Sequence, residues 1–285
     1  IQDVLGRPGL HDTEISAIIR RHGLCDVFDE SCEVEAWRAK AAYDPGDTRG
    51  RQDLQEALVV TIDPPDAQDF DDAISLTRDG QGGWALGVHI ADVSHFVVQG
   101  SALDRAALQR GNSVYLPSRT LPMLPELLSN EICSLQPGRP RYAKSVLLTY
   151  DGDGQVRSAR FADTVIRSKA RLTYTQVDQV LQGDGSGLPD PVVALLRDMR
   201  TLARAIEHRR RQAGMLQLPM PETRVVMDES GQVVGVEPED SSPPHTIVEM
   251  FMVEANVAVA SLLDPYCIPF LRRVHPDPNP AALRQ

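Results

Sequence analysis

The chain has few of the residues that mark disulfide-bonded, zinc-binding or membrane proteins. It contains four cysteines in 285 residues, none in a CxxC pair or at a zinc-ligand spacing, so we expect reduced, structural thiols. No apolar run approaches the ~18 residues that a membrane helix needs, and the N-terminus has no signal-peptide pattern. These absences predict a globular cytoplasmic protein with no membrane partner.

Two widespread catalytic motifs are also missing. The sequence has no Gly-x-Ser-x-Gly elbow, which argues against acyl transfer by serine, and no P-loop, which argues against ATP hydrolysis and a nucleotide cofactor. Asp151–Gln155 is similar to the start of a calcium loop, but the Glu expected at position twelve falls on Ala162. This segment therefore predicts a hairpin turn.

The negative charge of the chain is concentrated near its start. A formal charge of −11 is unusual for a nucleic-acid enzyme, because phosphates normally require a basic surface. Residues 1–72 carry 17 acidic and 7 basic side chains, whereas the remainder is nearly balanced. A later basic cluster predicts either a strip that follows an RNA backbone or a solvated sheet face. Its members are Arg139, Arg141, Lys144, Arg157, Arg160, Arg167, Lys169 and Arg171.

Five carboxylates crowd into Ile62–Asp72, directly after the apolar run Leu58–Ile62. Like charges this close raise one another's pKa and destabilise the fold unless a cation neutralises them. Mg²⁺ prefers one or two carboxylates plus water and substrate phosphates, and such a site activates water for displacement at a phosphate ester. The alternative is a solvated acidic turn. The predicted metal ligands are Asp63, Asp69, Asp71 and Asp72.

Asp63-x5-Asp69-x-Asp71-Asp72 resembles the catalytic signature of the RNase II/RNase R family, whose members carry an RNB domain. Further motifs of that family follow in the same order, and an ordered series over more than 200 residues is very specific. They are Val88–Ser94, Leu103–Arg105, Arg110–Pro117, Leu121–Glu126, Leu128–Asn130, Cys133–Leu135, Ser168–Tyr174, Ile247–Glu249 with Met252 and Ala255–Asn256, and Arg273–His275.

The resemblance implies a Mg²⁺-dependent hydrolytic exoribonuclease, in which Mn²⁺ can substitute. Such an enzyme digests single-stranded RNA from its 3′ end and releases nucleoside 5′-monophosphates. Asp63 and Asp72 would bind the first Mg²⁺, and Asp69 and Asp71 would be catalytic, with Asp71 closest to the chemical step. Positioning and charge neutralisation suffice for phosphoryl transfer. Two alternatives stay open: a non-catalytic RNA-binding module that kept the fold, and a DNA nuclease with a similar acidic site.

The resemblance also assigns two tyrosines to RNA binding. Tyr115 would stack on a nucleotide near the 3′ end, where stacking contributes ~1–3 kcal/mol; its other interpretation is an aromatic that fills a strand face. Tyr174 would also face the RNA, and its other interpretation is the first residue of a helix whose capping box is Thr173 and Gln176.

Glu249 is the third predicted RNA-binding residue. The resemblance places it against the last nucleotide, at a ribose hydroxyl that distinguishes RNA from DNA. Its other interpretation is a capping box that begins a helix at Thr246. Relatives usually carry a second acidic residue where this chain has Met250, so this part of the site is expected to differ. Asp92 is expected either to support the site or to pin a turn.

The pattern of elements predicts an α+β fold in which helices flank a curved, largely antiparallel sheet. The loop over 117–140, with five prolines, is expected to be ordered. The predicted strands are Leu58–Ile62, Ala73–Thr77, Trp84–Ile90, Ser145–Tyr150, Val156–Phe161, Arg224–Met227 and Val233–Val236. The predicted helices are Thr13–Arg21, Ser101–Arg110, Thr173–Leu181, Pro191–Gln212 and Thr246–Leu263.

Two regions follow from these patterns: a lead-in segment at 1–57 and an RNB catalytic domain at 58–285. Ile1 in place of Met, and a helix start at Asn279–Gln285 that stops within a turn, predict a fragment. Full family members carry a cold-shock/OB domain before this region, and a further active-site arginine and an S1 domain after it. We therefore expect residues 1–285 alone to bind metal but to degrade RNA poorly.

Overall fold

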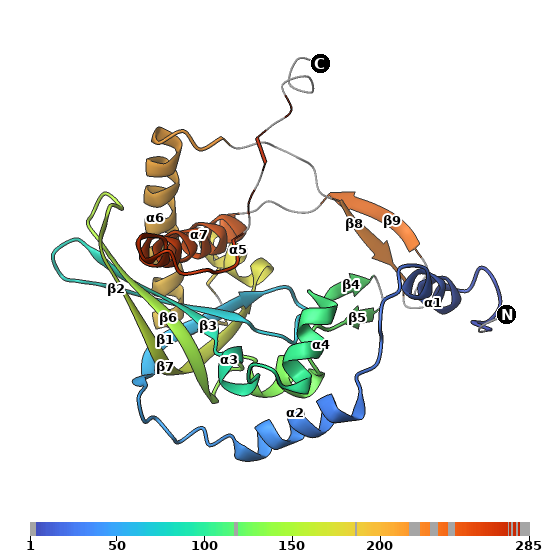
Figure 1. Cartoon of the computed structure of the whole chain (residues 1–285). Helices are drawn as coiled ribbons and strands as arrows, with labels where there is room; N and C mark the ends of the chain where they lie inside the picture. The colour runs from blue at the N-terminus through green and yellow to red at the C-terminus, as the bar shows by residue number, and fades with distance from the viewer. Residues whose placement is uncertain are drawn as a thin grey trace.

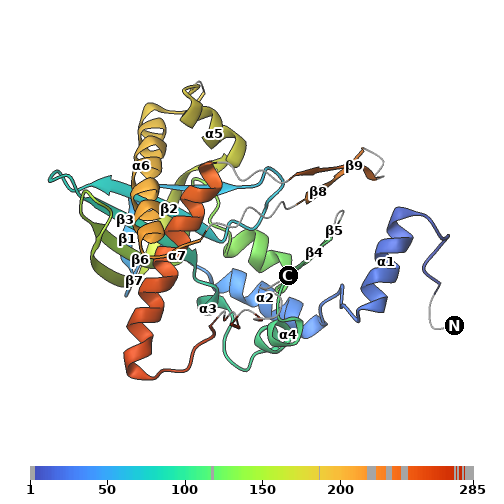
Figure 2. The same cartoon turned by 90° about the horizontal axis from the view of Figure 1, so that it is seen from above.

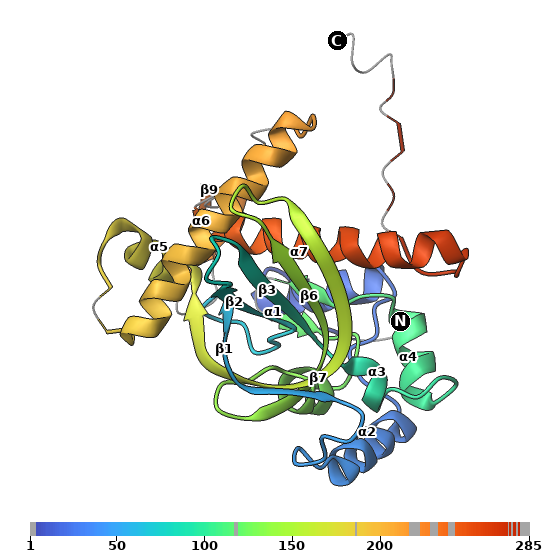
Figure 3. The same cartoon turned by 90° about the vertical axis from the view of Figure 1, so that its left-hand side faces the viewer.

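The computed structural model describes residues 4–116, 119–185, 187–216, 223–228, 233–238, 243–272, 274, 276–277 and 279. Its centre is a closed five-stranded barrel (Figures 1 and 3). Neighbouring strands are antiparallel except for the first and last, which pair in parallel and close the barrel. In spatial order the strands are β1 (Gln52–Asp63), β2 (Asp72–Arg78), β3 (Trp84–Ala91), β6 (Pro140–Tyr150) and β7 (Val156–Thr173).

Helices cover the barrel over two separate apolar cores. In one core, barrel residues such as Leu86 and Leu148 pack against α5 (Tyr174–Gln182), α6 (Asp190–Gln212) and α7 (Pro243–Leu263). Figure 2 shows α6 and α7 crossing the barrel side by side. The second core joins the barrel to α2 (Glu30–Ala42), α3 (Val93–Phe96), α4 (Ala102–Arg110) and the π-helical turn η1 (Leu127–Ile132). The predicted α+β class with a curved, largely antiparallel sheet is confirmed.

All of the predicted strands and helices form, and most extend beyond their predicted bounds. The barrel strands lengthen most, because their ends pair with neighbours that local apolar patterns do not reveal. The hairpin β8 (Thr223–Met227) with β9 (Val233–Pro238) and the helix α1 (His11–Arg21) also agree. The predicted turn at Asp151 is present, since its Oδ1 accepts hydrogen bonds from the amides of Asp153 and Gln155 at 3.0 and 2.8 Å.

Several elements were not expected from the sequence. The segment predicted as a loop over 117–140 contains the strand β5 (Arg119–Leu121), which pairs with β4 (Val114–Leu116), and the turn η1. The helix α2 was missed because its apolar side chains do not share one face: Cys32 and Ala36 are buried whereas Val34 and Trp37 are exposed. All four cysteines are free; Cys32 and Cys133 are buried, as structural thiols would be, whereas Cys25 and Cys267 are exposed. Arg273, His275 and residues 280–285 lie outside the described residues.

The helix α7 corrects the expectation about apolar runs. Pro243–Tyr266 is long and apolar enough, by length and composition, to cross a membrane, and 28% of its most apolar window is buried. Ile247, Phe251 and Ala255 pack one face of this helix against the barrel. One face of this apolar helix therefore forms part of the protein core.

A polar ladder crosses four barrel strands around His89. Its Nε2 lies 3.0 Å from the Ser75 hydroxyl and its Nδ1 lies 2.7 Å from the Ser145 hydroxyl, which in turn contacts Thr164 at 2.7 Å. His89 has no exposed surface, and burial lowers its pKa to about 4. The imidazole is therefore neutral at pH 7 and satisfied by hydroxyl groups on both sides.

Candidate active site

The four predicted aspartates line one open pocket of about 1050 Å³ at the edge of the barrel. Asp63 is the last residue of β1 and Asp72 is the first of β2, and these antiparallel neighbours return the chain to the same edge. Asp69 and Asp71 lie in the connection between them. The fold thus brings together all four carboxylates, as the spacing predicts; their individual roles stay a prediction.

Arg171 of β7 holds the first half of this acidic loop. Its Nη2 donates hydrogen bonds to the carbonyls of Pro64 at 3.0 Å and Pro65 at 2.6 Å, and charge-assisted hydrogen bonds of this kind are the strong ones. Ser134 fixes the second half, because its hydroxyl accepts from the Phe70 amide and donates to the Gln68 carbonyl. The carboxylates are therefore presented from a loop that is anchored at both ends.

The carboxylates repel one another in a partly buried environment. Asp63 is 8% exposed, and burial, with the nearby charges of Asp72 and Asp69, raises its pKa to about 6. Burial and the same kind of repulsion raise the pKa of Asp71 to about 6, although its carboxylate is more open to solvent. Burial also raises the pKa of Asp72. The loop therefore carries negative charge that its surroundings, with Arg171 as a nearby cation, compensate only in part.

The donor chemistry fits a hard cation, although the side chains do not yet surround one. Oδ2 of Asp63 is buried and has no hydrogen-bond partner within the part of the chain that the structure describes. Buried polar atoms are nearly always satisfied, so an oxygen left unsatisfied among other carboxylates suits Mg²⁺. Across the same residues, no group of three His, Cys, Asp or Glu side chains forms a ready-made metal centre.

Tyr115 lies in the same pocket as the aspartates. Its hydroxyl donates a hydrogen bond to Oδ2 of Asp69 at 3.2 Å, and 67% of the residue is exposed. The interpretation of Tyr115 as an aromatic that fills a strand face is therefore wrong. An exposed ring at the edge of an acidic pocket is free to stack on a base.

Tyr174 is both the first residue of α5 and a neighbour of the aspartates. The predicted capping box of Thr173 and Gln176 is present. Burial raises the pKa of Tyr174, and the charges of Asp72 and Asp63 raise it further. Its ring stacks on His245 of α7, with centroids 3.9 Å apart. Its predicted contact with RNA stays a prediction.

Glu249 is exposed on α7 and does not line the pocket of the aspartates. The interpretation of Thr246 as a helix cap is wrong, because α7 already begins at Pro243. Met250, the position where relatives usually carry an acidic residue, points into the core and is 2% exposed. Glu249 therefore keeps its predicted RNA contact as a prediction.

Comparison with known proteins identifies the family. The RNB domain family matches residues 51–285. The chain belongs to the RNB domain family. This RNB chain is 40% identical to Ribonuclease R of Thermotoga maritima over 99% of its own length and 40% of that protein. It is 33% identical to Ribonuclease R of Escherichia coli, over 99% of its own length and 35% of that protein.

Solved structures agree with this assignment. RNase R of Mycoplasma genitalium in complex with double-stranded RNA superposes with a TM-score of 0.93 at 33% identity, over 99% of this chain and 50% of that one. Yeast Ssd1, a pseudonuclease, shares the fold alone at 21% identity and a TM-score of 0.68, over 92% of this chain and 32% of that one. The RNB chain spans about two fifths of the length of the curated relatives it matches.

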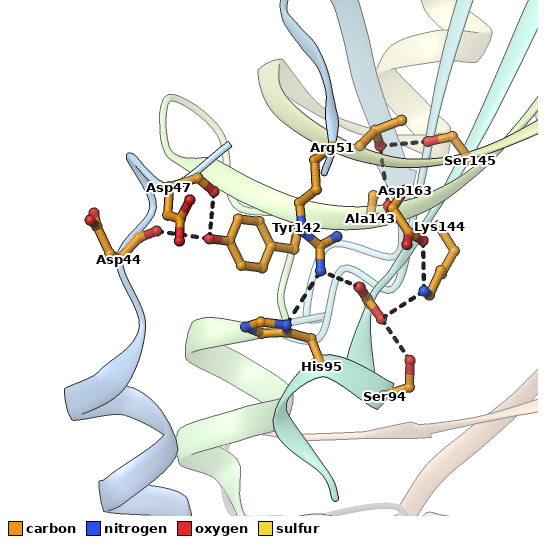
Figure 4. A network of polar contacts seen from close by, with 12 residues as sticks. Asp44, Asp47, Arg51, Ser94, His95, Tyr142, Ala143, Lys144, Ser145 and Asp163 are labelled. Atoms are coloured by element: carbon orange, nitrogen blue, oxygen red, sulfur yellow. Dashed lines mark hydrogen bonds and ion pairs between the residues drawn. The ribbon is translucent and has the colours of Figure 1, made fainter. Parts of the chain in front are cut away.

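Figure 4 shows Arg51, Ser94 and Lys144, the polar neighbours of Asp92. Asp92 does not line the pocket. It is 2% exposed and pairs with Arg51 at 2.7 Å, while the Ser94 hydroxyl donates to it at 2.8 Å. The Arg51 guanidinium stacks on Tyr142, whose hydroxyl donates to the Asp47 carbonyl at 2.7 Å. Burial alone raises the pKa of Asp92, but these hydrogen bonds and nearby cations outweigh it and lower the pKa.

The basic cluster of the RNB chain is largely occupied by internal partners. Lys144 pairs with Asp163 at 2.6 Å, Arg157 lies 3.7 Å from Asp79, and Arg141 is buried against backbone carbonyls. The interpretation of this cluster as a strip that follows an RNA backbone is therefore weakened. The other members with a protein partner are Arg160, Arg167, Lys169 and Arg171.

A buried ion-pair cluster in the RNB chain was not predicted. Glu254 of α7 is 4% exposed and contacts Arg209 Nη2 at 2.5 Å and Arg210 Nη1 at 3.1 Å. The Tyr150 hydroxyl donates to the same carboxylate at 3.2 Å. A glutamate within an apolar helix gives a weak signal for such a cluster, but its partners come from other elements.

Proposed function

We propose that this RNB domain hydrolyses single-stranded RNA stepwise from the 3′ end. The observation that carries the proposal is the gathering of Asp63, Asp69, Asp71 and Asp72 in one open pocket, where the buried Oδ2 of Asp63 has no partner among the described residues. The relatives named Ribonuclease R, and the RNase R structure solved with ribose-methylated single-stranded RNA, support the choice of RNA as substrate.

Asp63 and Asp72 would hold a first Mg²⁺, and Asp69 and Asp71 would complete the site. Mg²⁺, when bound, supplies charge neutralisation and a lowered pKa for water. Asp71, which is the most exposed to solvent of the four aspartates, orients water toward the phosphorus of the terminal phosphodiester. The P–O bond to the 3′ oxygen of the penultimate nucleotide breaks, and a nucleoside 5′-monophosphate leaves. The exposed ring of Tyr115 stacks on a nucleotide near the cut.

The test is digestion of a 5′-labelled single-stranded RNA, with Mg²⁺, Mn²⁺ or EDTA, by this RNB domain within a full-length protein; residues 1–285 alone are expected to digest it poorly. We expect a ladder that shortens from the 3′ end, release of nucleoside 5′-monophosphates, and loss of both with EDTA. A single-stranded DNA of the same sequence is the control for a DNA nuclease. Internal cuts, or equal digestion in EDTA, would contradict the proposal.

A second candidate is a non-catalytic RNA-binding module. One observation favours it: the described residues contain no group of three His, Cys, Asp or Glu side chains arranged to hold a metal ion. Thermal melts separate the two candidates. Mg²⁺ or Mn²⁺ should raise the melting temperature of the wild-type protein but not of a variant with Asp63→Asn and Asp72→Asn. RNA binding without any metal-dependent melt or hydrolysis would favour the non-catalytic module.

A further inference from the structure

One wall of the aspartate pocket comes from outside the region that matches the RNB family. Asp26, Val27 and Phe28 line the pocket, and they lie between α1 and α2. The family match begins only at residue 51. The pocket is therefore composite, and the segment Asp26–Phe28 is named here the N-terminal wall.

Arg110, the last residue of α4, holds the N-terminal wall in place. Its Nη2 donates to the Val27 carbonyl at 2.6 Å, and its Nη1 donates to the carbonyls of Cys25 at 2.9 Å and Pro122 at 3.1 Å. The guanidinium carbon lies 3.7 Å from the centre of the Phe28 ring. One side chain thus joins three segments of the chain.

The chemistry of this contact requires arginine. A planar guanidinium donates several hydrogen bonds in a fixed fork and stacks on aromatic rings, whereas a lysine ammonium is a compact point charge. Because the guanidinium is half-buried and engaged with carbonyls, Arg110 does not act on the RNA itself. It determines where the wall lies.

The wall also contacts the hairpin that carries Tyr115. Arg119 of β5 pairs with Asp26 at 3.4 Å, and Tyr115 stands opposite Thr120 in the β4–β5 pair. Asp26, Tyr115, Arg119 and Thr120 all line the pocket. The wall and the hairpin are thus linked across the same opening, so a nucleotide held by Tyr115 lies within reach of Val27 and Phe28.

We infer that the N-terminal wall contacts a base near the 3′ end of the RNA and that Arg110 is its positioning residue. Val27 is 67% exposed and offers an apolar surface, which suits a base or ribose, while the neighbouring Asp26 carboxylate disfavours a phosphate. This inference rests on the proposed function, since it assumes RNA in the pocket.

The test measures RNA binding separately from hydrolysis. In the Asp71→Asn background, the affinity for a short labelled single-stranded RNA is measured by fluorescence anisotropy for Arg110→Met, Arg110→Lys and Val27→Ser. Arg105→Met is the matched control, because Arg105 lies on the same helix, donates to the Gly100 carbonyl and does not line the pocket. The same substitutions in an otherwise wild-type, full-length protein give KM and kcat.

We expect Arg110→Met to weaken binding and to raise KM at least fivefold with kcat within twofold, and Arg110→Lys to restore less than half of the loss. Val27→Ser, an exposed change that leaves the fold intact, should weaken binding about threefold. Binding by Arg110→Met and Val27→Ser equal to that of Arg105→Met would overturn the inference. Should Arg110→Met not fold, Val27→Ser alone decides. Failure of the parent protein to bind RNA at all would overturn the proposed function together with the wall.

Discussion

Tyr115 and Asp69 are joined by a hydrogen bond of 3.2 Å between the tyrosine hydroxyl and Oδ2 of the carboxylate. The bond connects the β4–β5 hairpin to the acidic loop, although the two residues are 46 positions apart. The residue predicted to grip RNA therefore touches a residue predicted to hold metal. The placement of the tyrosine ring and that of the carboxylate are linked through this contact.

Tyr115→Ala should loosen the grip on short RNA and change the length of the final undigested oligonucleotide, because base stacking contributes ~1–3 kcal/mol. Tyr115→Phe keeps the ring and removes only the hydrogen bond to Asp69. We expect it to leave the end product unchanged. A sequencing gel of end products reads both variants. An identical ladder for Tyr115→Ala and wild type would contradict a role in RNA binding.

In a full-length protein, Asp71→Asn should abolish turnover while it leaves RNA affinity nearly unchanged. The change keeps the shape of the side chain but removes the charge that orients water, whereas stacking and backbone contacts supply most of the binding. Turnover and affinity are measured on the same labelled single-stranded RNA. If more than about a tenth of the turnover remains, corresponding to less than ~1.4 kcal/mol of barrier, Asp71 is not the central residue.

Asp63→Asn should stabilise the metal-free protein at pH 7 by up to ~3 kcal/mol, because a carboxyl pKa raised from 3.8 to about 6 costs about 1.4 kcal/mol per unit. The folded state binds the proton more tightly, so the cost is absent below pH 4 and grows as the pH rises to about 6. Urea unfolding at both pH values measures it, with Asp66→Asn of the same loop as control. Equal gains at pH 4 and pH 7 would disprove the electrostatic origin.

His89→Gln should flatten the acid side of the stability profile. The pKa of His89 falls from 6.5 to about 4 on folding, so the folded state binds fewer protons and stability is lost as the pH drops below 6.5. At pH 5 this loss amounts to about 2 kcal/mol. The gap in unfolding free energy between wild type and His89→Gln should therefore shrink between pH 7 and pH 5. The exposed His22→Gln serves as control, and a constant gap would contradict the prediction.

The parts of the fold that the sequence predicts are those with strong local signals. Short apolar runs mark the barrel strands, and the close spacing of Asp63 to Asp72 ensures that one strand connection and its two ends present all four carboxylates. The capping box at Thr173 is a local device and is present. The similar pattern at Thr246 does not cap a helix, because α7 already begins at Pro243.

The parts that could not be predicted depend on distant partners. The N-terminal wall is placed by Arg110, 83 to 85 positions further along the chain. Glu254 finds its cations on α6, and the basic residues around Lys144 find carboxylates on neighbouring strands. Which side chain meets which is decided by barrel closure, for which no short segment carries a signal.

The parallel pairing of β1 with β7 has a consequence for the order of assembly. Asp63 pairs with Thr173 across this seam, and Arg171, which holds the acidic loop, follows Pro65 by 106 positions. Contacts between such distant segments form late, because the chain must first close a long loop. The acidic loop emerges early in synthesis but acquires its anchor only with the last barrel strand. A nascent or partly unfolded chain therefore displays the aspartates without the arrangement that the proposed hydrolysis requires.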